Sequence, residues 1–188
     1  VELSRIDLKQ LKKVLPYLPD VEGWLGGSAH YVDSEGQMML SADVSLDHFV
    51  YEKSPLGNWA MNGVYLPGDN NTHHVDGFIM HNDQEIMFMN GIYQTDETGK
   101  ENITGELELQ HFPLWVINPF VPDGIVNFRG DIDGTLAMEG NPLKPVLNGG
   151  LQLDSVLMIM PDMSIGFRFD NKQVKMQDSK MVFDKFNI

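Results

Sequence analysis

Residues 36–49 read GQMMLSADVSLDHF, and apolar and polar side chains alternate through the second half of this stretch. The apolar positions are Leu40, Ala42, Val44 and Leu46, and a serine or an aspartate follows each of them. Because successive side chains of a strand point to opposite faces, this period of two predicts a strand with one apolar and one polar face. The same period recurs at residues 103–112, 146–158 and 164–170. The chain is therefore expected to be mainly β.

One short helix is expected near the N-terminus. Four leucines at spacings of three, four and three mark one helix face within residues 5–18: Leu8, Leu11, Leu15 and Leu18. Asp7 is placed to cap the first turn, and Pro16 is expected to end the helix after about two turns. Turn-forming residues separate the later strands, at 67–71, 96–99, 140–142 and 170–172.

Two proline strings mark an internal repeat. PYLPD at 16–20 aligns with PFVPD at 119–123 at an offset of 103, so that Asp20 matches Asp123. After an insertion of four residues the offset becomes 107. It then pairs Gly27 with Gly134, Ser28 with Thr135, Leu40 with Leu147, Val44 with Leu151, Leu46 with Leu153 and Asp47 with Asp154. Residues 1–8 match 107–114 at an offset of 106.

The repeat predicts how the chain is divided. We expect a first β unit at 1–106 with an N-terminal short helix, and a second unit at 107–188, truncated at its C-terminus. In the second unit, residues 111–120 take the place of the helix, and the two units form a single continuous sheet domain. A duplicated half of a β-sandwich is the alternative. Asp20 and Asp123 follow prolines, so they are interpreted as turn residues and not as catalytic carboxylates.

Composition excludes several function classes. The net charge of −14 makes nucleic acid an improbable partner, since phosphate binding needs concentrated Lys and Arg. The chain has no cysteine, which removes disulfides, thiol nucleophiles and iron–sulfur clusters. No apolar run has the length of a membrane-spanning helix, and no signal peptide opens the chain. The chain does not begin with Met, so we expect an excised fragment whose targeting segment lies outside it.

Residues 118–156, NPFVPDGIVNFRGDIDGTLAMEGNPLKPVLNGGLQLDSV, resemble the C-terminal region of the TamB family. That family comprises AsmA-like, bridge-like lipid-transfer proteins and is named after the translocation and assembly module. The matching elements are a helix ending in Asn118-Pro119-Phe120, the glycines Gly130 and Gly134, a turn from Gly140 to Gly149, and a Leu151-x-Leu153 strand. Residues 1–106 match more loosely.

The resemblance implies a fold and a function. The fold is an elongated, curved β-sheet trough (β-taco) of stacked repeat units with one or two short helices. The function is that of a periplasm-spanning cell-envelope protein whose apolar β-groove carries phospholipid between the inner and outer membranes, in support of outer membrane biogenesis. The implied partners are phospholipid or another amphiphile and an outer-membrane assembly barrel of the TamA/BamA type. An inner-membrane anchor would lie in a segment absent here.

The strand pattern supplies candidate groove-lining residues. They are the apolar members of the alternating strands: Leu40, Val44, Leu46, Leu107, Leu109, Leu136, Met138, Leu147, Leu151, Leu153, Ile165, Phe167 and Phe169. The 12 methionines suit a flexible lining for variable acyl chains, although methionine also fills gaps in ordinary cores. Replacing Leu151 or Leu153 by Asp or Arg is expected to abolish transport while the β fold survives.

No catalytic or metal site is expected. His73, His74 and His81 with Asp76 and Asp83 form a loose group, but their spacing matches no regular motif, and adjacent strand residues point to opposite faces. No nucleophile elbow or phosphate-binding glycine loop is present, so the chain is expected not to be an enzyme and to need no cofactor.

Two functions remain open beside a weaker third. The first is a lipid-transfer scaffold. The second is a chaperone or docking module that assists the assembly and secretion of outer-membrane β-barrel proteins by β-strand addition at an exposed sheet edge. The third, a glycan-binding surface domain, would need an aromatic platform with polar partners that the sequence does not assemble.

Overall fold

A computed structural model describes residues 1–34, 37–122 and 124–183. The chain divides into two compact units, Val1–Lys100 (unit 1) and Glu101–Ile188 (unit 2). The predicted division between residues 106 and 107 falls inside strand β7 (Glu101–Pro113). No helix in the described part of the chain is long and apolar enough to cross a membrane.

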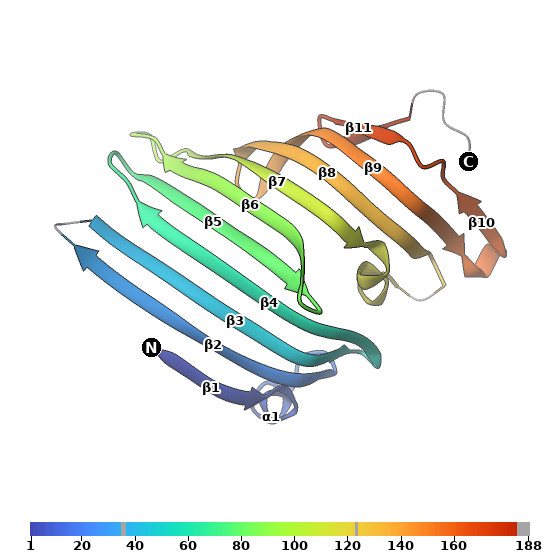
Figure 1. Ribbon diagram of the computed structural model, residues 1–188, viewed down its shortest axis with the longest axis horizontal. Helices are drawn as coiled ribbons and strands as arrows, with labels where there is room; N and C mark the ends of the chain where they lie inside the picture. Colours follow the sequence, from blue (N-terminus) through green and yellow to red (C-terminus); the bar gives the residue numbers. More distant parts are fainter. Residues whose placement is uncertain (35–36, 123, 184–188) are drawn as a thin grey trace. The chain divides into compact units, whose positions relative to one another are not determined.

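Unit 1 is an antiparallel meander (Figure 1). Its elements are β1 (Glu2–Asp7), α1 (Leu8–Val14), β2 (Val21–Ser34), β3 (Gln37–Tyr51), β4 (Ser54–Pro67), β5 (Thr72–His81) and β6 (Gln84–Thr95). Each strand pairs with the next one along the chain, so the described strands of this unit form a single layer.

Unit 2 repeats the meander with shorter strands at its end. Its elements are β7, the 3-10 helix η1 (Leu114–Phe120), β8 (Asn127–Asn141), β9 (Lys144–Met160), η2 (Pro161–Met163), β10 (Ile165–Arg168), β11 (Gln173–Gln177) and β12 (Lys180–Val182). β9 is long enough to pair with β8 along one edge and with β10 and β11 in succession along the other.

The prediction of a mainly β chain with short helices is therefore confirmed, and the predicted turns all separate strands. The N-terminal helix is shorter than residues 5–18, because residues up to Asp7 belong to β1. Asp7 caps it as expected, by accepting a hydrogen bond from the backbone N–H of Lys9, and the helix ends at Val14, ahead of Pro16. Asp123 lies outside the described residues.

The repeat extends to the pairing register of the strands. Gly27 pairs with Val44 in unit 1, and Gly134 pairs with Leu151 in unit 2, at the predicted offset of 107. The first strands follow the offset of 106, since Leu3 pairs with Gly27 and Leu109 with Gly134. Even the irregularities recur at matching places, where the register shifts in β2 and again in β8. The sequence repeat is thus a repeat of hydrogen-bonded structure.

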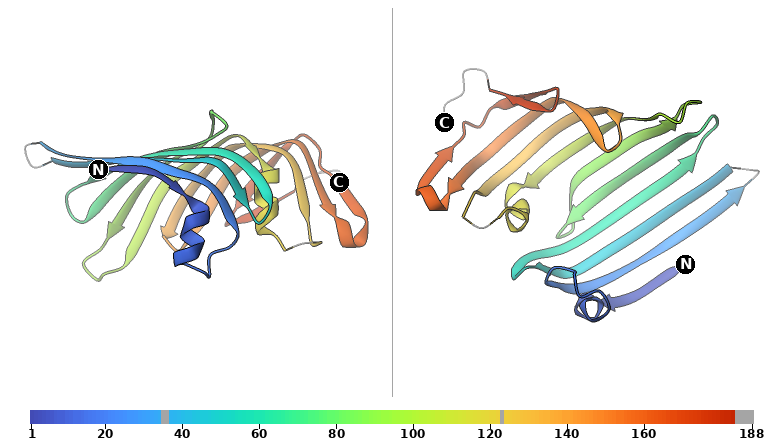
Figure 2. Two further views of the ribbon diagram at one scale, coloured as in Figure 1. Left: turned by 90° about the horizontal axis from the view of Figure 1, so that it is seen from below. Right: turned by 180° about the vertical axis from the view of Figure 1, so that it is seen from behind.

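Each unit has an apolar face and a mixed face. Residues directly opposite each other in a ladder share a face. The apolar face of unit 1 carries Leu3, Val44, Met61 and the residues that lie opposite them in the ladders. The apolar face of unit 2 carries Leu109, Leu151 and the residues that lie opposite those two. The mixed face carries the intervening residues. In each unit the short helix lies against one side of the sheet near one end of the long strands (Figure 2).

The two units differ in how much apolar surface they bury. Among the described residues of unit 1, the buried apolar side chains are Leu8, Leu56 and Ile86. Unit 2 has more of them: Leu109, Val116, Leu136, Leu151, Leu153, Val156 and Val174. Leu153, Val156 and Val174 form a core against which Leu114 of η1 packs. Unit 2 therefore has a small packed core, whereas most of the apolar face of unit 1 is not packed.

Candidate functional site

The apolar face of unit 1 is built from rows of side chains that cross the strands. One row runs from Gly27 through Val44, Met61 and Ile79 to Met87. The next row consists of small residues, Ala29, Ala42, Gly63 and Gly77, and ends at Met89. A third row consists of Tyr31, Leu40, Tyr65, Val75 and Gly91. The small row therefore lies between two rows of larger side chains over β2 to β5.

Large side chains on this face are exposed. Met61 is 50% exposed, Leu3 44%, Leu40 40% and Met89 36%. They come from β1, β3, β4 and β6, so the exposed surface extends across unit 1 and is not one protruding residue. Contiguous exposed apolar surface on a soluble protein commonly marks a binding site. This face is the candidate site.

The predicted lining residues of unit 1 all lie on this face. Leu40, Val44 and Leu46 alternate along β3, with Leu40 exposed and the other two half-buried. Their neighbours across β4 are Tyr65, Met61 and Trp59 in that order. Tyr65 and Trp59 were not among the predicted lining residues, whereas Met61 is one of the methionines that were expected to supply a flexible lining. The two aromatic residues could have been found only by knowing the register, because β4 carries a less regular alternation.

In unit 2 the predicted residues also gather on one face. Leu107 lies opposite Leu136, and Met138 lies opposite Leu147. Leu109 and Leu151 lie opposite the same residue, Gly134, from its two neighbouring strands. Leu153 and Phe169 join the core that contains Val174. Ile165 and Phe167 pair with Met160 and Met158 at the far end of β9.

Several of these unit 2 residues are packed and do not line an open surface. Leu109, Leu136, Leu151 and Leu153 are buried, and Leu151 is only 3% exposed. A charge at Leu151 or Leu153 would have to be buried, which destabilises the fold. We therefore expect charged variants of Leu151 and Leu153 to disturb the fold, contrary to the expectation from the sequence. A charge that tests ligand binding is better placed at the exposed residues of unit 1.

An apolar hollow of about 390 Å³ opens at the end of unit 2 that carries η2. Met158, Met160 and Met163 contribute to its lining together with Ile125 and Val126. Ile125 and Met163 are exposed. Three methionines in one hollow give a lining that adapts to ligands of different shape.

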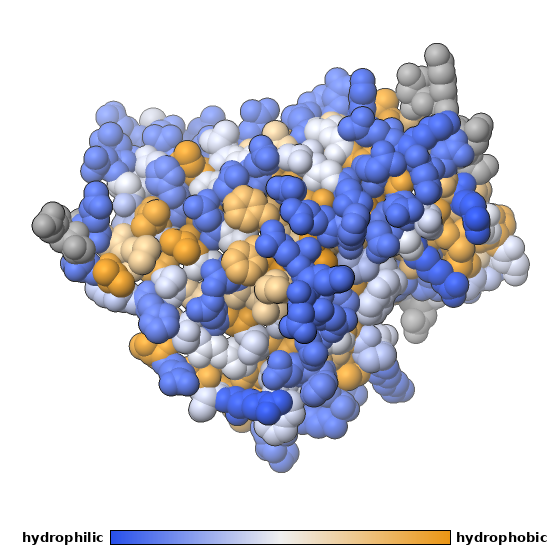
Figure 3. Space-filling view, viewed as in Figure 1, coloured by the Kyte–Doolittle hydropathy of each residue, from blue (hydrophilic) through white to orange (hydrophobic). Residues whose placement is uncertain are grey.

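A second hollow, of about 470 Å³, has a lining that combines polar and apolar residues. It lies over β2 to β5 of unit 1, and residues of the mixed face, among them Ser45, Asn62 and Phe78, make up most of its lining. Polar groups lie beside apolar ones in this hollow, and the Asn62 amide donates a hydrogen bond to Asp43. Figure 3 shows hydrophobic and hydrophilic residues intermixed on the surface seen in that view.

The histidines do not form a metal centre. His73 and His74 lie on opposite faces of β5, as expected for adjacent strand residues, and His81 is buried, with its Nε2 2.9 Å from the carbonyl oxygen of Leu56. Within residues 1–34, 37–122 and 124–183, no group of three or more His, Asp or Glu side chains is placed to hold a metal ion. His73 instead joins Tyr65, whose hydroxyl lies 2.7 Å from Nδ1.

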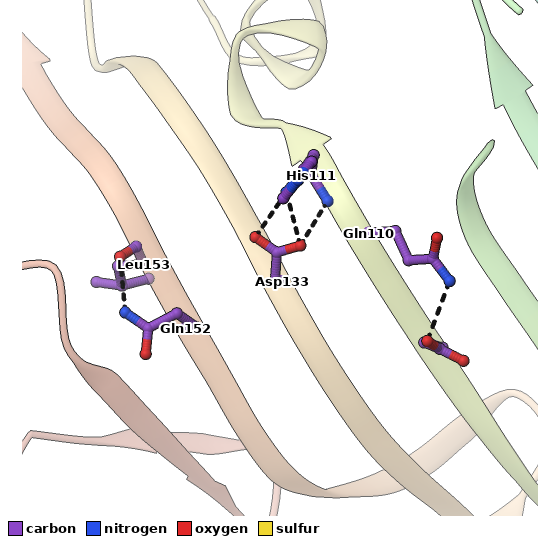
Figure 4. A network of polar contacts seen from close by, with 6 residues as sticks. Gln110, His111, Asp133, Gln152 and Leu153 are labelled. Carbon is purple, nitrogen blue, oxygen red and sulfur yellow. Dashed lines mark hydrogen bonds and ion pairs between the residues drawn. The ribbon is translucent and has the colours of Figure 1, made fainter. Parts of the chain in front are cut away.

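A charged cluster occupies the mixed face of unit 2 (Figure 4). Asp133 accepts hydrogen bonds from both the backbone N–H and the ring of His111, and its hydrogen bond raises the pKa of that imidazole. Asp131 lies directly opposite Asp154 in the ladder. Partial burial, and then the like charge of Asp154, raise the pKa of the Asp131 carboxyl. Asp131, Asp133 and His111 thus form a local charge network.

Comparison with known proteins gives no family for this chain. No family model matches it, and neither the curated proteins nor the solved structures contain a match. Function must therefore be inferred from the two faces and their chemistry.

Proposed function

We propose that this chain binds the acyl tails of amphiphiles on the apolar face of its sheet and serves as a segment of a lipid-transfer protein. The observation that supports this most is the exposure of Met61, Leu3, Leu40 and Met89 on one face of a single-layer sheet. A ligand that covers an apolar surface of this kind stabilises the complex by roughly 25 cal/mol per Å² of apolar surface removed from water.

The surface suits a ligand that is held without a fixed position. Each methylene buried contributes about 0.8 kcal/mol, irrespective of direction, so an acyl chain could bind firmly while sliding along the face. The methionines adapt to chains of different shape at small cost. A phospholipid would fit this description, because its tails need an apolar surface and its head group needs water.

The resemblance of residues 118–156 to the TamB family extends the proposal to the whole protein. The chain would then be a fragment of a periplasmic, cell-envelope protein that moves phospholipid between the inner and outer membranes. Its partner in the outer membrane would be an assembly barrel of the TamA/BamA type. This extension rests on the residues of the resemblance, and the binding proposal stands without it.

Two adjacent residues provide a matched test. Leu40 on the apolar face is 40% exposed, and Met39 on the mixed face is 36% exposed. Replacing each by Asp places the same charge on opposite faces of β3 at nearly equal exposure. We expect Leu40→Asp to weaken the affinity for a phospholipid about tenfold or more, because the bound acyl tail would have to cover the new carboxylate. Met39→Asp should leave the affinity within about twofold of the wild-type value.

Native mass spectrometry and fluorescence titration with a short-chain phospholipid below its micelle concentration give the two readouts. Circular dichroism and the thermal midpoint show whether both variants keep the fold. Equal binding by wild type and Leu40→Asp, or absence of any lipid binding by the wild type, would contradict the proposal.

A second candidate is docking of an extended peptide by β-strand addition. Strand β1 lies at the end of the strand order, and within the described residues only β2 pairs with it. An unpaired strand edge can accept another strand through backbone hydrogen bonds. Cross-linking from β1 would then capture barrel-protein segments, and Leu40→Asp would leave capture unchanged.

A further inference from the structure

A cluster of polar aromatic side chains occupies one end of the apolar face of unit 1. The hydroxyl of Tyr65 lies 2.7 Å from Nδ1 of His73, and the two rings stack with centroids 5.7 Å apart. The ring of Tyr93 lies 5.6 Å from that of His73, and Thr95 donates a hydrogen bond to the Tyr93 hydroxyl. Such rings combine an apolar body with a polar tip, so they suit a boundary between apolar surface and water.

Trp59 marks the other end of the same face. It lies on β4, opposite Leu46 on one side and His81 on the other, and its indole N–H donates to the carbonyl oxygen of Leu56, which is buried. Tyr65 lies six positions after Trp59 along β4, which corresponds to about 20 Å of strand. One leaflet of a bilayer has a hydrocarbon thickness of about 15 Å, half of the usual core. A single acyl chain laid along β4 from the polar cluster would therefore cover about three quarters of the distance to Trp59, and its terminal methyl group would lie near the Trp59 end.

Charge indicates which head group would suit the polar end. Residues 21–95 contain ten Asp and Glu residues, whereas Lys53 is their only Lys or Arg. Asp69 lies in the turn that follows β4, and Asp96 follows β6, so both lie at the end of the strands where the cluster lies. The Thr98 hydroxyl and backbone N–H groups hydrogen-bond to Asp96 and lower the pKa of its carboxyl, which keeps it ionised.

We propose that the apolar face of unit 1 binds its amphiphile in one orientation, with an amine-bearing head at Tyr65, His73 and Tyr93 and the tail directed along β4 toward Trp59. The head is zwitterionic or cationic, as in phosphatidylethanolamine, because an anionic head would meet a surface of its own sign. This inference rests on the proposed function, since it assigns a direction and a head group to the ligand of that same face.

Quenching of Trp59 by brominated lipid tests the orientation. The full chain with Trp24→Phe and Trp115→Phe retains Trp59 as its sole tryptophan. It is titrated with phosphatidylethanolamine whose acyl chains are long enough to approach Trp59 from the polar cluster and carry bromine either near the terminal methyl group or near the ester. We expect the terminal bromine to quench Trp59 more strongly. Equal quenching by the two probes, or stronger quenching by the ester-proximal bromine, overturns the orientation while leaving the proposed function intact.

Two further arms test the head group and separate the two proposals. Phosphatidylglycerol with the same acyl chains should bind about three- to tenfold more weakly than phosphatidylethanolamine, and Tyr65→Phe with Tyr93→Phe should reduce that difference. Tyr17→Phe, at an 82% exposed position outside the face, serves as the control and should change nothing. Equal or tighter binding of phosphatidylglycerol overturns the head-group assignment. If no lipid binds in any arm, the proposed function fails and this inference fails with it.

Discussion

Single backbone positions set how closely the strands of unit 2 approach. Gly149 has a φ of +155° and lies opposite Leu136. A Cβ added there would fall on the carbonyl oxygen of Thr135, a backbone atom that cannot move aside. Gly150, its neighbour on the other face, has no such φ, and its Cβ would meet only the flexible side chain of Gln173.

These two glycines predict a sharp contrast. We expect Gly149→Ala to lower the free energy of unfolding by about 2–4 kcal/mol, because both the backbone conformation and the ladder must change. Gly150→Ala should alter it by less than about 1 kcal/mol, since Gln173 can rotate away. Urea unfolding followed by circular dichroism measures both, and equal effects would show that the close approach at Gly149 is not structurally important.

His111 makes a pH-dependent contribution to unit 2. Its pKa is raised from the ordinary value of 6.5 by the hydrogen bond and the charge of Asp133. The stabilisation is therefore fully present below the unfolded pKa and is lost as the pH rises through the higher folded pKa. We expect the protection of backbone amides around His111, where the register of β7 against β8 shifts, to fall across that interval once the intrinsic pH dependence of exchange is divided out. His111→Asn tolerates the positive φ but does not titrate, so it should remove the pH step.

Asp131 is a position at which a substitution should stabilise the chain. It lies opposite Asp154, and burial and that like charge raise its carboxyl pKa, so its ionised form opposes folding at neutral pH. The opposition is relieved as the pH falls through the raised pKa. Asp131→Asn should therefore stabilise the chain at pH 7 by a few tenths of a kcal/mol, up to about 1 kcal/mol. A fall in the thermal midpoint at pH 7 would contradict this assignment.

At the scale of elements, both units build their strand bulges in the same way. His48 in β3 and Ser155 in β9 have φ values of 51° and 53° and are related by the offset of 107. In each case the side-chain oxygen of an asparagine on the following segment accepts a hydrogen bond from the backbone N–H of the bulge residue. The His48 nitrogen lies 2.8 Å from Oδ1 of Asn58, and the Ser155 nitrogen lies 2.9 Å from Oδ1 of Asn171. The side chain thus replaces the ladder partner that each bulge loses.

Removal of one asparagine tests this role. Asn58→Ala should destabilise the chain by about 0.5–1.5 kcal/mol, because the N–H of His48 loses its acceptor. Asn58→Asp keeps an acceptor oxygen and should cost less. Chemical denaturation gives the energies, and the exchange rate of the His48 amide shows whether the effect is local. Equal costs for the two variants would contradict a role for the side-chain oxygen.

At the scale of the whole molecule, ligand binding should appear as stability. An amphiphile that binds only the folded chain, supplied at a hundred times its dissociation constant, raises the free energy of unfolding by about 2.7 kcal/mol. We expect short-chain phosphatidylethanolamine to raise the thermal midpoint of the wild-type chain and of Met39→Asp. The midpoint of Leu40→Asp should rise clearly less, because a tenfold loss of affinity leaves only about 1.4 kcal/mol of that stabilisation at the same lipid concentration. A midpoint that falls on addition of lipid would indicate binding to the unfolded chain.

The sequence by itself determined the strands, the turns and the repeat. Alternation at residues 36–49 and 146–158 specifies which side chains share a face, because the period of a strand is two whatever its neighbours are. The repeat offset of 107 also relates two pairs of the sheet that the structure shows, Gly27 with Val44 and Gly134 with Leu151. These are local properties or consequences of duplication, so they can be read along the chain.

Only the tertiary structure decided which apolar side chains are packed and which are exposed. Val44 and Leu151 are equivalent in the repeat, yet Leu151 is 3% exposed and Val44 is half-buried; Leu40 is 40% exposed, whereas its equivalent Leu147 is half-buried. Burial depends on what crosses over a face, and near Leu153 that is Leu114 of η1 and Phe169, distant in sequence. The grouping of Tyr65, His73 and Tyr93 likewise depends on register across three strands, which residue types alone do not specify.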